Sequence, residues 1–166
     1  MRRLSLFGAV ASATVVLASI AYAQQQGAPP PPAPPFGTPI TLDQAKKVAA
    51  AAEAEAKKNN LNSAFAVVEP TGALVYFAKM DGSQYAAVNV AMDKATSAAL
   101  YRRPTAAFDA GLRAGNTYLM TLRGMNAVPG GIPIVVDGKL IGAIGVSGGS
   151  GPEDAQVAEA GAAALK

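Results

Sequence analysis

The stretch VPGGIPIVVDGKLIGAIGVSGG, residues 128–149, decides the fold that we expect for this chain. Two apolar runs, Ile132–Val136 and Leu140–Val146, flank the dipeptide Asp137-Gly138. Asp-Gly between β-branched runs is a strong signal for a two-residue hairpin, because a type I′ turn requires positive φ at both central residues. The sequence therefore predicts two antiparallel strands joined at this dipeptide.

Both faces of this hairpin are predicted to be covered by other parts of the chain. Each run is apolar at odd and even positions alike, which is typical of strands buried on both sides. Gly142 and Gly145 lie within the second run, and a missing side chain there indicates close approach of another backbone.

Glycine also flanks the hairpin at its open end. Gly130-Gly131 precedes the first strand, and Ser147-Gly148-Gly149 follows the second. Because the strands are antiparallel, both glycine sets are predicted at the same end of the sheet. Their backbone N–H groups can meet an anionic or carbonyl ligand with no Cβ in the way. The alternative interpretation is that they are turn glycines only.

The first residues of the 166-residue chain have the features of an export signal. Arg2-Arg3, an apolar stretch and Ala21-Tyr22-Ala23 predict a signal peptide over residues 1–23, and therefore a periplasmic or extracellular protein. The alternative is an uncleaved membrane anchor. Ser5 interrupts the usual twin-arginine pattern, so general secretion is the preferred route.

Residues 24–39 are predicted to be a proline-rich linker. Their first part reads QQQGAPPPPAPP, and consecutive prolines favour the extended polyproline II conformation. Such a segment can be a spacer, a ligand for a proline-reading partner or simply a solvated tail.

Composition excludes several kinds of chemistry. The chain contains no cysteine and no histidine, which excludes disulfides, thiolate or imidazole metal sites and Ser-His-Asp hydrolysis. Removing Arg2 and Arg3 with the signal leaves 12 basic and 11 acidic residues, a net charge of +1. This near-neutral balance gives no argument for nucleic acid or an acidic membrane surface as partner.

Residues 40–166 are long enough for one domain with one core. A second hairpin is predicted from strands at 63–68 and 73–78, joined by Glu69-Pro70-Thr71-Gly72. Helices are predicted at 41–58, 85–100, 105–114 and from 150 onward, with an irregular segment at 115–127. Two hairpins and flanking helices make an α+β domain on an antiparallel sheet.

Three basic residues are candidates for ligand binding. Lys94 falls at the edge of an apolar helix face, where it either snorkels to solvent, the preferred interpretation, or is held in a pocket with a lowered pKa. Arg102 and Arg103 can clamp a carboxylate, or, as is commoner, they satisfy carbonyls at the end of the helix. Thr105 is expected to cap the short helix that follows.

Several segments together resemble the GlcG/HbpS family, whose members are called haem-binding or haem-degrading proteins. The resemblance covers residues 40–166 and rests on PGGIPIVVDGKLIGAIGVSGG (129–149), FAKMDG (77–82), DKATSAA (93–99), YRRPT (101–105) and EDAQVAEAG (153–161). It implies a profilin-like three-layer domain with an antiparallel sheet of about five strands flanked by helices. It also implies assembly into homo-oligomers and haem or a related tetrapyrrole as ligand.

The leading functional hypothesis is an exported small-molecule-binding protein that takes haem, another tetrapyrrole or a small anionic metabolite. Its expected ligand-binding residues are Lys94, Arg103, Gly130, Gly131, Ser147, Gly148 and Gly149. Histidine ligation of haem iron is excluded, which leaves Tyr76, Tyr85, Tyr101, Tyr118, Met80, Met92, Met120 and Met125 as candidate iron ligands. The alternatives are an enzyme that uses Lys94 on an oxo- or carboxylate-bearing metabolite, and an oligomeric accessory module.

Overall fold

The computed structural model describes residues 32–165. The predicted signal peptide (1–23) and the first part of the predicted linker (24–31) lie outside the described residues. Within the described part of the chain, no helix is long and apolar enough to cross a membrane.

Both predicted hairpins are present and form one antiparallel sheet. Its order is β2-β1-β4-β3, from the strands β1 (Ala64–Val68), β2 (Leu74–Lys79), β3 (Gly131–Val136) and β4 (Lys139–Ser147). Asp137 and Gly138 have φ values of 50° and 73°, as the predicted type I′ turn requires. The described residues thus form four strands, where the resemblance implied about five.

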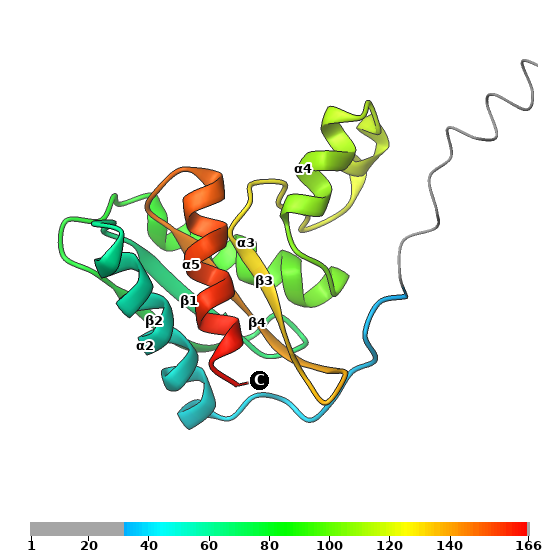
Figure 1. The fold of residues 1–166 in the computed structure, drawn as a ribbon. Coiled ribbons are helices and arrows are strands. Elements are labelled where there is room, and N and C mark those ends of the chain that lie inside the picture. Colours follow the sequence, from blue (N-terminus) through cyan, green and yellow to red (C-terminus); the bar gives the residue numbers. More distant parts are fainter. Residues whose placement is uncertain (1–31, 166) are drawn as a thin grey trace, which may run out of the picture. The chain divides into compact units, whose positions relative to one another are not determined.

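Helices cover both faces of the sheet (Figure 1). Four α-helices and one 3₁₀ helix are described: α2 (Leu42–Lys58), α3 (Ala87–Tyr101), α4 (Ala106–Arg113), η1 (Thr117–Thr121) and α5 (Gly151–Ala163). α2 and α5 pack on one face, and α3 packs on the other. The α+β class is therefore confirmed, with the sheet as the middle layer.

Alanines let α3 lie very close to the sheet. Its buried side includes Ala91, Ala95 and Ala98, and these pack on Ala64 and Ala66 of β1. A Cβ on Gly145 would collide with the backbone of Ala91 and Ala95, so the close approach predicted from this glycine is confirmed. Gly145 pairs with Gly131 at the open end of the β3–β4 hairpin, so this tight contact places α3 beside that end.

Capping boxes begin two of the helices. Thr41 and Gln44 form a capping box at the start of α2, and Ser150 and Glu153 do the same for α5. α3 begins at Ala87, two residues after the predicted start, because the preceding residues form a turn. The predicted irregular segment 115–127 contains the short η1.

The described end of the predicted linker is bound to the sheet. Leu140 N donates a hydrogen bond to Pro35 O at 2.8 Å, and Gly37 N donates to Leu140 O at 2.7 Å. Ile40 follows as a buried member of the core beneath α2 and α5. Pro35 is itself exposed, but its carbonyl is anchored beside β4.

Candidate functional site

The structure brings the two predicted glycine sets together at the open end of the β3–β4 hairpin. Gly131 lies opposite Gly145, and Val146 N donates to Gly130 O at 2.9 Å. β4 ends at Ser147, and α5 begins at Gly151. The start of α5 therefore lies directly after the second glycine loop, as the sequence predicts.

Lys94 reaches this end of the sheet, but it does not snorkel. Its side chain is 1% exposed, and its Nζ donates to Asp154 Oδ2 at 2.7 Å and to Val146 O at 2.9 Å. The carboxylate partner comes from α5, sixty residues further along the chain. The snorkelling interpretation is wrong because the ammonium group binds β4 and α5 and does not reach solvent.

Burial shifts both members of this ion pair toward their neutral forms. Desolvation lowers the pKa of Lys94, and the hydrogen bond and charge of Asp154 oppose that change. Desolvation likewise raises the pKa of Asp154, against the hydrogen bonds from Lys94 and from Gly149 N, which lies 2.8 Å from Asp154 Oδ1. The ammonium and the carboxylate thus both have hydrogen-bond partners within the protein, and both are shielded from solvent.

Gly130 closes the pair on one side. Its φ is +124°, and an added Cβ would lie 2.8 Å from Asp154 Cβ and 2.9 Å from Lys94 Nζ. The backbone at Gly130 therefore packs directly on the ion pair, with no room for a ligand between them. The enzyme alternative requires that a substrate can reach Lys94. In this arrangement the lysine has no free face for a substrate.

The other glycines of the predicted site have structural contacts too. Gly148 packs on Asn62 O and Ser63 Oγ, and a Cβ there would lie 2.5 Å from each. Ser147 lies opposite Ala64 at the end of the sheet. These residues converge as predicted, but their backbones are engaged with the protein itself.

Thr105 ties the first glycine loop to the start of α4. Its buried Oγ1 donates to Val128 O at 2.8 Å and accepts from Gly131 N at 3.0 Å. Its backbone N also donates to Gly131 O at 3.0 Å. Thr105 is the N-cap residue of α4, as expected, but its side chain makes no capping hydrogen bond, because the hydroxyl fastens the loop before β3 instead.

The two adjacent arginines serve different contacts. Arg103 Nε donates to Tyr101 O at 3.4 Å, and its guanidinium lies 5.5 Å from the centre of the Phe108 ring. This confirms the helix-end interpretation for Arg103, which does not join the glycine loops. Arg102 instead donates to Pro34 O at 3.1 Å.

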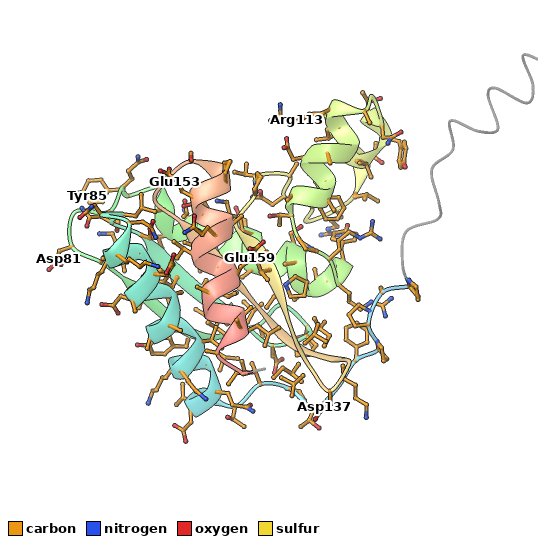
Figure 2. The ribbon with its side chains drawn as sticks, viewed as in Figure 1. Asp81, Tyr85, Arg113, Asp137, Glu153 and Glu159 are labelled. Atoms are coloured by element: carbon orange, nitrogen blue, oxygen red, sulfur yellow. The ribbon has the colours of Figure 1, made fainter. Side chains whose placement is uncertain are left out.

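A cavity of about 330 Å³ lies outside the buried ion pair. Its lining is Asp109 and Arg113 from α4, Ala127, Val128 and Pro129 from the loop before β3, and Gly151 and Pro152 from the start of α5. Figure 2 labels Arg113 on α4 and Glu153 in the first turn of α5. The positive end of the α5 dipole and one arginine therefore face the same space.

Arg113 is the residue of this cavity that sequence reasoning missed. Its Nε lies 2.9 Å from Asp109 Oδ2, and the hydrogen bond and charge of Asp109 raise the pKa of the arginine. The i, i+4 spacing of the two residues was the available signal, but it indicates only a helix-surface ion pair. Nothing in the local sequence connects α4 to the start of α5.

Three cavities in the described part of the chain differ in whether they contain a candidate iron ligand. The cavity beside Arg113 includes neither tyrosine nor methionine. A second cavity, of about 260 Å³, contains Met125 beside Asp93, with no cation in its lining. A third, of about 410 Å³, contains Met80 with Lys57 and Lys79, but the Met80 sulfur already accepts a hydrogen bond from Ser63 N. Within residues 32–165, no group of three acidic side chains is placed to hold a metal ion, and the chain has no histidine or cysteine.

Comparison with known proteins identifies relatives along most of the domain. Residues 40–163 match the family model described as "Haem degrading protein HbpS-like". Protein GlcG of Escherichia coli strain K12 is 41% identical over 112 residues, which cover 66% of this chain and 84% of that protein.

Solved structures agree with this assignment. A double mutant of HbpS from Streptomyces reticuli has a TM-score of 0.73 at 34% identity, covering 78% of this chain and 89% of that one. The PduOC:heme complex has the same fold, with a TM-score of 0.70 at 21% identity, covering 78% of this chain and 96% of that one. The chain therefore belongs to the HbpS-like family, as its motifs had indicated.

Proposed function

We propose that this chain binds a small molecule through the carboxylate groups of that molecule, in the cavity between α4 and the start of α5. The observation that carries the proposal is the lining of this cavity. Arg113 is paired with Asp109 through Nε, its other guanidinium nitrogens are donors that suit a carboxylate, and the first turn of α5 supplies a favourable dipole. Its volume, about 330 Å³, is at the lower end of ligand pockets in general.

The family supports a tetrapyrrole such as haem as one ligand of this kind, and a small anionic metabolite as another. Both present carboxylates, so the cavity selects for that shared group. Because no histidine is present and no methionine or tyrosine lines the cavity, we expect the iron to contribute little to affinity. Haem and iron-free protoporphyrin IX should then bind with similar affinity.

Export and self-association are further parts of this proposal. The features of residues 1–23 support secretion to the periplasm or beyond. Tyr118 and Met120 of η1 are 65% and 66% exposed, and such side chains support assembly into a homo-oligomer. Sequencing of the exported N-terminus and sedimentation at micromolar concentration test these two points separately.

The experiment that tests the binding site is a titration of the purified full chain with haem, protoporphyrin IX and a small dicarboxylate. Arg113→Met should weaken binding by about tenfold or more, since a hydrogen bond to a charged group contributes about 1.5–3 kcal/mol. Arg123→Met is the matched control, because Arg123 is exposed and does not line this cavity.

Two results would oppose the proposal. Unchanged affinity in Arg113→Met would move the ligand out of this cavity. A sharp low-spin haem spectrum, with haem bound far more tightly than protoporphyrin IX, would show that methionine or tyrosine ligates the iron after all.

A further inference from the structure

Residues 34–40 form a strap along β4, just before the segment that matches the family model. Phe36 pairs with Leu140 as a parallel bridge, and Ile40 N donates to Ile141 O at 2.8 Å. The pairing of β4 with β1 ends at Val68 and Ala143. The strap therefore uses main-chain groups of β4 that β1 leaves free. Figure 1 shows this segment passing the β3–β4 hairpin before it enters α2.

Arg102 holds the outer end of the strap. This residue ends α3 in the left-handed region, with φ 53°, and its guanidinium lies 5.0 Å from the centre of the Phe36 ring. The same guanidinium donates to Pro34 O at 3.1 Å. One side chain thus contacts both the aromatic ring and a carbonyl of the strap, which a shorter or unbranched cation would not do.

The strap has the chemistry of a bound peptide. Pro35 has no N–H and uses only its carbonyl, which accepts from Leu140 N. Prolines at 34, 35 and 39 favour an extended backbone, so little conformational entropy is lost when the segment binds. A Cβ on Gly37 would lie 2.9 Å from Lys139 Cβ, so any other residue at this position requires the strap or Lys139 to move.

We propose that the edge of β4 at Leu140 and Ile141, together with Arg102, is a peptide-binding slot that works by strand addition. It recognises a Pro-Pro-Phe-Gly segment, and residues 34–37 of the same chain occupy it. Main-chain hydrogen bonds provide the affinity, and the contacts of Phe36 and Gly37 provide the selectivity. This inference is independent of the ligand cavity beside Arg113.

A matched pair of substitutions in the full chain tests the slot. Gly37→Val should force the strap out by collision with Lys139, whereas Thr38→Val changes the exposed neighbouring residue of the strap. Hydrogen exchange at Leu140 N–H should accelerate by about tenfold or more in Gly37→Val and stay unchanged in Thr38→Val. Exchange in the β1–β4 ladder should stay slow in both.

A synthetic peptide then asks whether the emptied slot binds a segment in trans. The peptide PAPPFGTPIT, which copies residues 32–41, should restore slow exchange at Leu140 of the Gly37→Val chain. The same peptide with alanine in place of phenylalanine should not. Adding Arg102→Asn, which keeps a residue tolerant of positive φ, should abolish the rescue.

The proposal is overturned if Gly37→Val leaves exchange at Leu140 unchanged, or if saturating peptide fails to slow it. It is also overturned if the alanine peptide rescues as well as the native sequence, because the slot would then recognise no particular segment. Rescue that persists after Arg102→Asn would remove Arg102 from the slot and contradict the proposal as stated.

Discussion

Two ion pairs lie near the open end of the β3–β4 hairpin, with similar distances and opposite surroundings. Lys94 and Asp154 are 2.7 Å apart with side chains 1% and 3% exposed, whereas Arg113 and Asp109 are 2.9 Å apart and 77% and 30% exposed. Burial leaves the first pair no solvent to replace a lost partner, while water can replace either partner of the second. The comparison separates a pair that fixes the fold from one that is free to meet a ligand.

Loss of the buried partner should give the largest effect on stability. Lys94→Met keeps the length of the side chain but leaves the Asp154 carboxylate buried with only backbone donors, from Gly148 and Gly149. Breaking a buried pair in this way costs about 3–5 kcal/mol, which urea unfolding will measure. Adding Asp154→Leu should recover a large part of that loss, because the uncompensated charge is removed.

A small loss in Lys94→Met, within the range of ordinary surface substitutions, would contradict the assignment of this pair to the fold. So would a double variant that is less stable than Lys94→Met alone. The first result would mean that water reaches Asp154 once the ammonium is gone, and the second that the bond from Gly149 N to Asp154 outweighs the uncompensated charge.

Thr105 should give the next largest effect, since it anchors the loop that separates the two ion pairs. Thr105→Val removes the hydroxyl and leaves Val128 O and Gly131 N without their partner. We expect a loss of about 1–3 kcal/mol in the free energy of unfolding. Thr105→Ser keeps the hydroxyl and should retain most of the stability; equal losses in the two variants would assign the effect to packing of the methyl group.

A smaller effect should appear with pH at the first turn of α5. The hydroxyl and then the backbone N–H of Ser150 lower the pKa of Glu153 by donating to its carboxylate, at 2.7 and 2.8 Å. A lowered folded-state pKa means that the stabilisation is complete above the unfolded-state pKa and is lost as pH falls through the folded-state value.

Glu153→Gln isolates this term, because glutamine still accepts a hydrogen bond but does not titrate. The difference in urea midpoint between the original chain and this variant should change only across that acidic window. A constant difference at all pH values would show that ionisation of Glu153 does not stabilise the cap.

Local patterns in the sequence predicted most of the fold. Asp137-Gly138 defined the main hairpin, and Gly145 indicated the close approach of α3. Each of these depends on residues within a few positions of one another, or on space that only glycine leaves. The boundaries that shifted, such as the start of α3, are those without a capping side chain.

The chemistry of the candidate site was harder to predict, because its partners come from distant segments. Helix periodicity placed Lys94 at the edge of an apolar face, but its burial depends on Asp154 of α5. The hydroxyl of Thr105 was assigned to the nearest helix start, whereas its partners lie 23 and 26 residues away. Arg113 carries no local signal for a cavity that includes the start of α5.

The smallest effect on stability should come from Arg113→Met, the counterpart of Lys94→Met in the exposed pair. Because both Arg113 and Asp109 contact solvent, we expect the urea midpoint to stay within experimental error. A ligand titration with this variant therefore reports on the cavity itself, with no contribution from partial unfolding. If instead the midpoint fell as far as in Lys94→Met, the pair would be holding α4 in place, and weaker ligand binding would no longer identify Arg113 as a contact.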